Sequence, residues 1–392
     1  MAEYSITEVS AGDRYTMEQV VRLLEAEGIR KDRNLDYTCA MLDEDYNVIA
    51  TGSCFGNTLR CMAVDHRHQG EALMNDIVTH LVDYQFQRGN YHLFLYTKCS
   101  SAKFFGSLGF HEIARVEGQI VFMENRRNGF AEYLDRLRKE TDAALREMQG
   151  RPVMSATGTD GIQQAATAGQ GGNRPEHAGA AGKGQQGEGV SALVMNANPF
   201  TLGHRYLADL AAGQSSLLHL FIVSEDRSLV PFPVRKRLVM EGTAGHGNII
   251  YHDSGSYIIS SATFPAYFQK DDTAVIESQA RLDIAVFAKI ASALNITTRF
   301  VGEEPMSQVT GIYNRIMQEA LPDCGVTCVT IPRKQAPDGR PISASTVRLC
   351  LQNGDWDTLE ALLPQTTLEF FRSAEAAPVL ERIRRAGDVV HY

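Results

Sequence analysis

One segment, residues 155–189, limits what this chain can fold into because it cannot join a hydrophobic core. Glycine, alanine and glutamine dominate it, and Ile162 is almost its only large apolar side chain. A segment of this composition buries too little apolar surface to offset the entropy lost on ordering. The chain has 392 residues, which is too many for one ordinary hydrophobic core. The segment therefore predicts a division into two domains.

We expect the first domain to span residues 1–140 and the second to span residues 190–392. Between them, residues 141–189 would form the end of a helix and a flexible linker. A glycine-rich coil of this length reaches on the order of 30 Å, which would let the two domains move relative to each other.

The charge of the chain argues against some broad functional classes. Lysine and arginine total 38 against 47 acidic residues, a net charge of −9, which disfavours general binding of nucleic acid or of a membrane surface. No apolar run approaches the roughly 20 residues of a membrane helix, and residues 1–10 lack a signal-peptide pattern, so we expect a cytoplasmic protein. The seven cysteines are scattered, which predicts reduced thiols and no metal ligands.

A short loop after the linker is the first candidate site. Residues 190–210 begin with an apolar run, break at Asn198 and Pro199, and resume apolar residues at helical spacing, which predicts strand, loop and helix. The free N–H groups of a helix's first turn attract anions, and Thr201 and His204 can donate hydrogen bonds to phosphate oxygens. The candidate nucleotide-binding residues of this loop are Asn198, Pro199, Phe200 and Gly203.

Taken alone, that loop could equally be an ordinary turn, but a second donor-rich helix start lies near the end of the chain. Ser343 and Ser345 are favourable N-cap residues, and Thr346 adds a hydroxyl. Arg348 is expected in the first helical turn, where its guanidinium suits a phosphate. Two further cations, Arg333 and Lys334, precede this motif.

The region after residue 190 alternates apolar runs with amphipathic helices. Strands are expected over residues 217–223, 248–251, 298–301 and 326–331, and helices over residues 234–241, 273–294, 310–320, 356–363 and 380–385. Strands separated by helices predict an α/β fold with a parallel sheet, in which ligands bind at the carboxyl ends of the strands.

The first domain carries a third motif. Arg67, Gly70 and Ala72 form an R-x-x-G-x-A pattern between an expected strand and helix, and residues 93–110 predict another strand and helix. These two pieces resemble the acyl-CoA-binding core of the GCN5-related acetyltransferases, an α/β fold. The resemblance implies that backbone amides at the helix start bind the pyrophosphate of a CoA-like arm.

Phe105 marks a departure from that family. It stands four residues before Gly109, where many of these acetyltransferases carry a tyrosine general acid. Because phenylalanine cannot donate a proton, we expect the domain to bind a CoA-like arm without transferring acetyl groups, unless Tyr96 or Cys99 takes that role. Beyond this core, residues 124–148 predict a charged amphipathic helix.

The two helix starts together resemble the paired signatures of the nucleotidyltransferase superfamily, whose first motif is usually H-x-G-H. Here Thr201 replaces the first histidine, and His204 is retained. The whole arrangement resembles the family of citrate (pro-3S)-lyase ligases, over essentially all of the chain except the linker. The segments that carry this resemblance are MNANPFTLGHRYL, SEDRSLVPFPVRKRLVMEGT, SATFPAYF and FVGEEP.

This resemblance implies an acid–thiol ligase, which uses ATP to acetylate the thiol of the phosphoribosyl-dephospho-CoA group on the acyl carrier subunit of citrate lyase. Acetate would attack the α-phosphorus of ATP to give acetyl adenylate and pyrophosphate, and the thiol would then release AMP. By the same resemblance, His204 and Thr201 hold the α- and β-phosphates, and Mg²⁺ bridges phosphate oxygens. Ser343, Ser345 and Arg348 would hold the leaving pyrophosphate.

Three other functions stay open. An adenylyltransferase that attaches AMP to a phosphorylated small molecule would share the nucleotide motifs, but it would not need a CoA-binding domain. An acetyltransferase with a regulatory nucleotide-binding domain is disfavoured by Phe105. A non-catalytic sensor of nucleotide and CoA is disfavoured because both phosphate motifs are retained.

Overall fold

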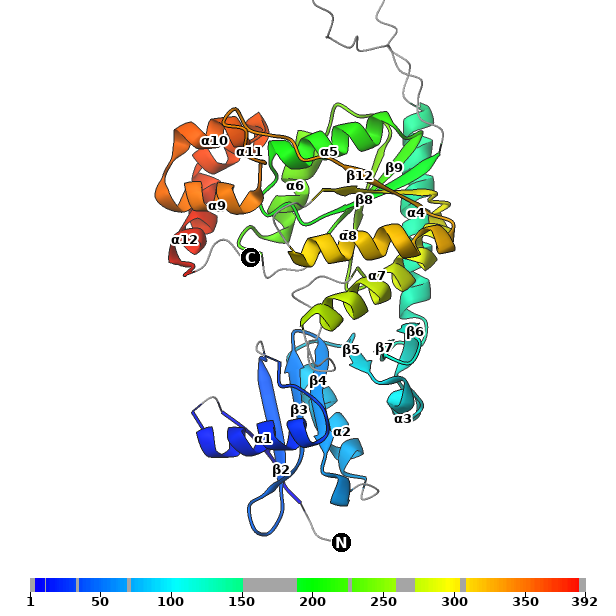
Figure 1. Cartoon of the computed structure of the whole chain (residues 1–392), viewed down its shortest axis with the longest axis vertical. Coiled ribbons are helices and arrows are strands. Elements are labelled where there is room, and N and C mark those ends of the chain that lie inside the picture. Colours follow the sequence, from blue (N-terminus) through cyan, green and yellow to red (C-terminus); the bar gives the residue numbers. More distant parts are fainter. Residues whose placement is uncertain are drawn as a thin grey trace, which may run out of the picture.

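The computed structural model describes residues 4–10, 12–32, 35–68, 72–150, 189–224, 228–258, 272–303 and 308–387. They form two α/β parts, one around each of two sheets (Figure 1). We call the part built on the earlier sheet the first part, and the part built on the later sheet the second part. The α/β fold class predicted from the sequence is confirmed.

The sheet of the first part has seven strands in the order β1-β2-β3-β4-β5-β7-β6. These strands are β1 (Ile6–Glu8), β2 (Tyr37–Leu42), β3 (Val48–Phe55), β4 (Thr58–Val64), β5 (Phe94–Thr97), β6 (His111–Val116) and β7 (Ile120–Glu124). Neighbouring strands are antiparallel except β4 and β5, which are parallel and pair at Thr58 with Phe94 and at Leu59 with Leu95. Within the described residues β4 and β5 pair no further, so the sheet opens between them.

Three helices pack on this sheet, namely α1 (Arg14–Ala26), α2 (Leu73–Gln87) and α3 (Ala102–Ser107). Successive side chains of a strand point to opposite faces. On β5, Leu95 therefore joins the core beneath α2 and α3, whereas Phe94 and Tyr96 join a core that the first part shares with the second. The second part therefore covers one face of the sheet at β5, β6 and β7, whereas α1 packs on the strands β2, β3 and β4.

The sheet of the second part has five parallel strands in the order β10-β9-β8-β11-β12. They are β8 (Val190–Met195), β9 (Leu217–Ile222), β10 (Ile249–Asp253), β11 (Thr298–Gly302) and β12 (Thr327–Ile331). The predicted Rossmann-like parallel sheet is confirmed. The strand order puts β8 in the centre, where the connections diverge to the two sides, which is where such sheets bind ligands.

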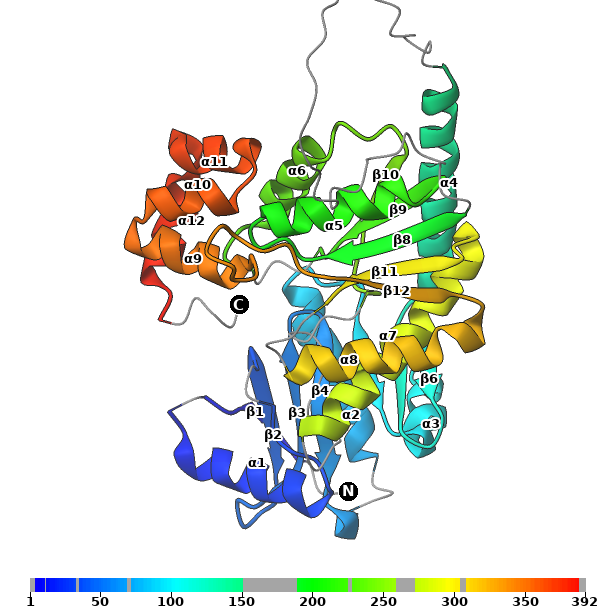
Figure 2. The same ribbon diagram turned by 45° about the horizontal axis from the view of Figure 1, so that its top comes forward.

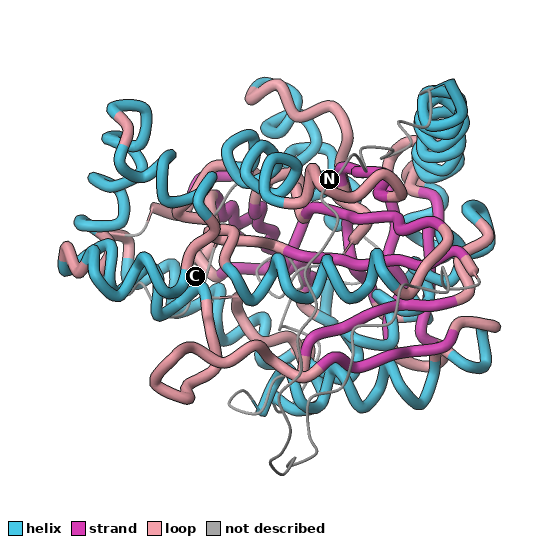
Figure 3. The backbone as a smooth tube through the Cα atoms, turned by 90° about the horizontal axis from the view of Figure 1, so that it is seen from above, coloured by secondary structure: helices cyan, strands magenta, loops and turns pink. Residues whose placement is uncertain are grey.

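Helices cover both faces of this parallel sheet, as burial of both faces requires (Figure 3). One core contains α5 (Leu202–Gly213), α6 (Phe232–Gly242), α9 (Ala344–Asn353), α10 (Trp356–Leu362), α11 (Gln365–Arg372) and α12 (Ala377–Arg385). The other contains α7 (Asp272–Leu294) and α8 (Gln308–Ala320).

Helix α4 (Gly129–Gly150) starts beside the first sheet and runs along the second part (Figure 1). Its residues Phe130, Tyr133 and Leu137 join the shared core. The buried carboxylate of Glu124 accepts hydrogen bonds from the Tyr257 hydroxyl at 2.7 Å and from the Phe130 N–H at 2.7 Å. The two parts are therefore held together by apolar packing and by buried polar contacts.

The shared core corrects our expectation that a linker lets the two domains move freely. Lys289 of α7 donates to the carbonyl oxygen of Ile113 at 2.6 Å, and Ser278 donates to Gln119 at 2.9 Å, so α7 is also bonded to the first sheet. The predicted boundary at residue 140 falls inside α4, and residues 155–188 lie outside the described residues. The proposed division into domains stays a prediction.

The strands β6 and β7 and the helix α11 were not expected from the sequence. A helix was expected from Glu124 onward, whereas Glu124 ends β7 and α4 starts at Gly129. Glu124 looks like a charged surface residue in the sequence, but it is buried because His92, Tyr257 and the N–H of Phe130 all bond it. His92 and Tyr257 are distant from Glu124 in the chain, so local patterns could not reveal the strand.

Cutting the chain within residues 155–188 should leave the two fragments associated, because α4 and α7 hold the parts together. A specific protease site inserted there, cleaved completely, should give two chains on a denaturing gel and one peak in size-exclusion chromatography. The uncut protein with the same insertion is the control. Elution of two separate fragments under native conditions would contradict the shared core.

A chain of hydrogen bonds through two buried histidines also ties α4 to the second sheet. Glu140 of α4 bonds Nδ1 of His252 at 2.8 Å, and Nε2 of His252 bonds Nδ1 of His219 at 2.9 Å. Burial, and then the neighbouring His252, lower the pKa of His219 to about 3. Folding therefore keeps His219 neutral at a pH where the unfolded chain binds a proton.

The free energy of unfolding should fall as the pH drops from about 6.5, the ordinary pKa of histidine, towards 3. Between pH 7 and pH 4.5 we expect the wild type to lose about 2–3 kcal/mol more than His219→Phe, which cannot take up a proton. Chemical denaturation at both pH values measures the difference. Equal losses in the two proteins would show that His219 does not titrate as proposed.

Candidate active site

The predicted loop lies at the carboxyl end of the central strand β8, between Met195 and Leu202. Thr201 is the N-cap of α5, and its hydroxyl oxygen accepts the His204 N–H at 3.3 Å. In return, the Thr201 N–H donates to Nδ1 of His204 at 3.2 Å. This reciprocal capping fixes the start of α5 and the position of the imidazole.

These contacts define the protonation state of His204. Because a backbone N–H can only donate, Nδ1 must carry a lone pair, which leaves the proton on Nε2. Burial, and then the positive charge of Arg333, lower the pKa of His204 to about 4. The imidazole is therefore neutral at physiological pH and has an Nε2–H that can donate to an anion beyond the strand end.

Thr201 occupies a different position from the one its predicted role requires. Its side chain is buried, and its hydroxyl lies 2.9 Å from Nδ1 of His204. Thr201 thus contacts His204 and presents no free hydroxyl at the surface.

The second predicted helix start is α9, whose N-cap is Ser343. The Ser343 hydroxyl accepts the Thr346 N–H at 3.1 Å and lies 3.2 Å from the Ser345 hydroxyl and 2.8 Å from the Thr346 hydroxyl. Three hydroxyl groups therefore gather at one helix start, as the sequence suggested.

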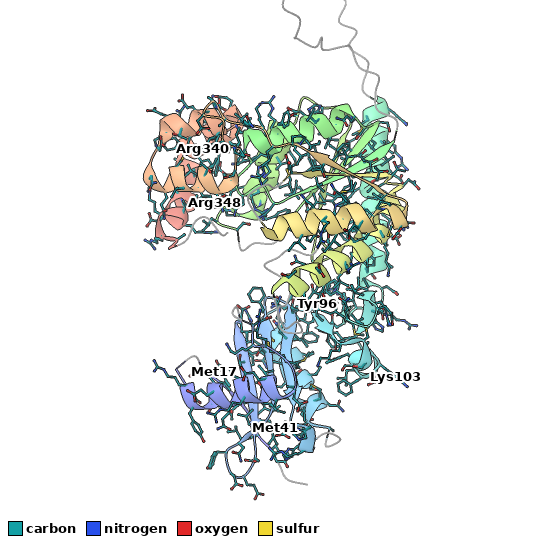
Figure 4. All side chains as sticks on the ribbon, in the orientation of Figure 1. Met17, Met41, Tyr96, Lys103, Arg340 and Arg348 are labelled. Carbon is teal, nitrogen blue, oxygen red and sulfur yellow. The ribbon has the colours of Figure 1, made fainter. Side chains whose placement is uncertain are left out.

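Arg348 does not lie in the first turn of α9, as the sequence suggested. The helix begins at Ala344, so Arg348 is in its second turn, and the side chain is only 3% exposed. Its Nη1 donates to the carbonyl oxygen of Asn198 at 2.6 Å. The guanidinium thus reaches across to the first loop, and Figure 4 labels it on α9, in the second part.

A close backbone approach also joins the two motifs. A Cβ atom on Gly203 would lie 3.2 Å from the carbonyl oxygen of Ile342, which is tighter than ordinary side-chain contacts. Glycine at this position therefore lets the start of α5 approach the segment before α9. Together with the bond from Arg348 to Asn198, this contact makes the two motifs a single site.

The other loop residues point inward. Phe200 is fully buried, and the Asn198 side chain accepts the Val230 N–H at 3.0 Å. Pro199 is buried as well. These residues shape the loop, and what they can offer a ligand is mainly the backbone.

Arg333, which had no role assigned from the sequence, lies close enough to His204 for its charge to lower the pKa of that histidine. Its Nε donates to the carbonyl oxygen of Glu303 at 2.8 Å, which joins the loops after β11 and β12. Lys334 beside it lies over the ring of Tyr206, with its Nζ 5.8 Å from the ring centre. In the sequence, the two adjacent cations Arg333 and Lys334 just before the second motif were the feature that could have indicated this position.

Arg235 and Arg237 of α6 look alike in sequence but differ in the fold. Arg235 is fully buried and donates to the carbonyl oxygens of Asn196, Val223 and Val230, at 2.7, 2.8 and 3.0 Å. Arg237 lies at the surface and pairs with Glu375 at 2.9 Å. Arg235 therefore supports the loops at the carboxyl ends of β8 and β9 from beneath.

The first part contains a cavity of about 680 Å³, in the opening between β4 and β5. Ala72 lines it and forms the N-cap of α2 with φ at 61°, in the left-handed region. Gly70 lies outside the described residues. Arg67 does not line the cavity, because its side chain is 71% exposed and pairs with Asp65 at 2.7 Å.

Phe105 and Tyr96 both line this cavity. Burial raises the pKa of Tyr96, so its hydroxyl stays protonated at neutral pH, and Figure 4 labels it near the junction of the two parts. Cys99 does not line the cavity, and its thiol donates to the carbonyl oxygen of Val116 at 3.5 Å. The cavity is large enough for a pantetheine-like arm.

Among the described residues, no group of three or more His, Cys, Asp or Glu side chains is placed to hold a metal ion. Within the same residues, no helix combines the length and the apolar character that crossing a membrane demands.

The fold and the site define a two-part α/β protein, with a ligand-binding loop at the switch point of a parallel sheet and a second cavity in a mixed sheet. A family described as "Citrate lyase ligase C-terminal domain" matches residues 190–371. Curated proteins named citrate (pro-3S)-lyase ligase are 33% identical in Klebsiella pneumoniae and 34% identical in Haemophilus influenzae. The alignments cover 86% of this chain and 88% of the first relative, and 89% of this chain and 93% of the second.

A ligase of the same name from Escherichia coli is 31% identical, over 94% of this chain and 93% of its own. The chain belongs to the citrate (pro-3S)-lyase ligase family.

Solved structures similar to the chain include a GNAT-family acetyltransferase from Staphylococcus aureus, at 13% identity and a TM-score of 0.28. It covers 32% of this chain and 100% of that one. The ribosomal-protein-S18-alanine N-acetyltransferase from Escherichia coli is 17% identical with a TM-score of 0.25, over 31% of this chain and 92% of that one.

Proposed function

We propose that this chain is an ATP-dependent ligase that acetylates citrate lyase. ATP, acetate and the thiol form of the lyase would give AMP, pyrophosphate and acetyl-lyase. The chain's family supports the assignment, since its relatives are named ligases of citrate (pro-3S)-lyase. The observation that carries it is the joining of two donor-rich helix starts, through Arg348 with Asn198 and through Gly203 with Ile342.

The proposed site activates acetate by positioning and by electrostatics. The acetate oxygen attacks the α-phosphorus of ATP, the bond from that phosphorus to the bridging oxygen breaks, and pyrophosphate leaves. The neutral His204 donates its Nε2–H to phosphate oxygens, and Thr201 holds the imidazole for that task. The hydroxyl groups of Ser343, Ser345 and Thr346 face the pyrophosphate, where charge builds as it leaves.

Two positive side chains complete this assignment. Arg333, beside His204, supplies charge near the phosphates. Arg348 acts as a positioning residue, because it is bonded to the loop itself. Mg²⁺ would enter as the counter-ion of ATP.

The cavity of the first part would hold the CoA-like arm of the acyl carrier subunit. Its volume and its partly apolar lining suit a pantetheine chain, and the start of α2 offers backbone N–H groups to the pyrophosphate of the arm. Phe105 cannot serve as a general acid, so this cavity binds the arm and the second part performs the activation.

The test is to incubate the full chain with ATP, radiolabelled acetate and deacetylated citrate lyase. We expect label on the carrier subunit, together with AMP and pyrophosphate, and inhibition of labelling by free dephospho-CoA. AMP joined to a small acceptor would indicate an adenylyltransferase. Transfer from acetyl-CoA without ATP would indicate an acetyltransferase, and either result would overturn the proposal.

A further inference from the structure

A second cavity, of about 260 Å³, lies beneath the carboxyl ends of β8, β9 and β11. Helices α7 and α8 close it on the side that faces the first part, and Figure 2 shows β8, β11 and β12 side by side with α8 along that face. The walls are mostly apolar and are formed by Val194, Val223, Ile258, Phe300, Val301 and Met317. None of the functions described above uses this cavity.

Three of the polar side chains that line the cavity, Asp283, Arg299 and Tyr313, are bonded to one another. Asp283 accepts hydrogen bonds from Arg299, at 3.3 and 3.4 Å, and from the Tyr313 hydroxyl. Asp283 and Arg299 are both nearly fully buried. Asp283 neutralises the charge of Arg299, and only Nε of Arg299 is left without a hydrogen-bond partner among the described residues. The rest of the lining is mostly apolar and favours a hydrocarbon group.

The cavity lies on the side of the nucleotide loop that the chemistry requires. Asn196 lines it and directly follows β8, so its mouth adjoins the loop of residues 196–201. It takes residues from β8, β9 and β11 and none from β12 or α9, whose start would hold the pyrophosphate. Because attacking and leaving oxygens stand in line across the phosphorus, the nucleophile must approach from the side away from α9.

We propose that this cavity is the acyl pocket of the enzyme, which takes the hydrocarbon end of a short-chain carboxylic acid and points its carboxylate at the α-phosphate. This inference rests on the proposed function. The side chain of Met317, at the inner face of α8, sets how long an acid the pocket accepts.

The test compares Met317→Ala with Ile316→Ala, a matched control on the same helix. Both side chains are almost fully buried in the same core, but Ile316 does not line the cavity. The assay is the exchange of labelled pyrophosphate into ATP that depends on added acid, measured with acetate and with butyrate. Thermal unfolding checks that both variants are folded.

We expect Met317→Ala to raise the ratio of kcat/KM for butyrate to that for acetate at least 10-fold, since one methylene in a fitted pocket changes kcat/KM by roughly 10- to 200-fold. Ile316→Ala should keep the wild-type ratio. If Met317→Ala does not fold, Val194→Ala replaces it, since Val194 lines the same cavity.

Unchanged ratios in both variants, with acetate-dependent exchange intact, would overturn the pocket and leave the proposed function standing. Absence of acetate-dependent exchange in the wild type would instead overturn the proposed function, and the pocket with it.

Discussion

Replacing His204 with alanine should lower kcat for acetate-dependent pyrophosphate exchange by about 100- to 1000-fold. Removing a donor aimed at developing charge costs about 3–4 kcal/mol of transition-state stabilisation in comparable sites. We propose that the Nε2–H of His204 is such a donor, because Thr201 fixes the imidazole and the lowered pKa keeps it neutral. Steady-state kinetics at saturating ATP and acetate measures the loss.

His246→Ala is the matched control for that experiment. His246 bonds Asp209 of α5 at 2.7 Å, so it touches the same helix away from the loop, and its removal should leave kcat within about twofold. A His204→Ala enzyme within a factor of two of the wild type would refute the assignment. Because the pKa of His204 is about 4, this residue should not change its charge near pH 6.5. Any pH dependence of kcat in that range should therefore be the same in the wild type and in His204→Ala.

Replacing Arg235 with methionine should lower the free energy of unfolding by about 3–5 kcal/mol, the range seen when one partner of a buried charged network is removed. The change leaves the carbonyl oxygens of Asn196, Val223 and Val230 without the donor that now bonds them. Buried carbonyl groups without a partner are costly. Denaturant unfolding at neutral pH measures the loss.

Arg237→Met provides the comparison, two residues along the same helix. Arg237 is exposed and its contact with Glu375 is a surface ion pair, which contributes about 0–1 kcal/mol. We expect the two variants to differ by several-fold in their effect on stability. Equal effects would mean that Arg235 does not support the loops at the ends of β8 and β9.

Local signals in the sequence predicted the site well at the level of the backbone. The break at Asn198 and Pro199 and the N-cap at Ser343 are properties of a few neighbouring residues, and both helix starts lie where they were expected. Side-chain direction was harder to predict. Arg348 was a candidate for phosphate binding, yet it donates to a loop carbonyl oxygen from inside the fold, as Arg235 also does.

The reason is that a buried arginine and a ligand-binding arginine carry the same local pattern, a cation near a helix start. Which one it is depends on the packing of other elements, and the sequence does not display that packing. The same holds for Glu124, whose partners His92 and Tyr257 come from both parts of the molecule.

The course of α4 fixes the distance between the cavity of the first part and the loop after β8. The helix leaves the first sheet, crosses to the second part and docks there through Glu140 and Tyr133, so the long glycine-rich segment departs only after the junction of the two parts has been made. The distance between the cavity of the first part and the loop after β8 is then set by α4 and α7, and we expect that changes in the length of that segment do not alter it. Under the proposed function, the prosthetic group of the carrier would therefore have to move between the two sites, while the two parts of the enzyme keep their relative position.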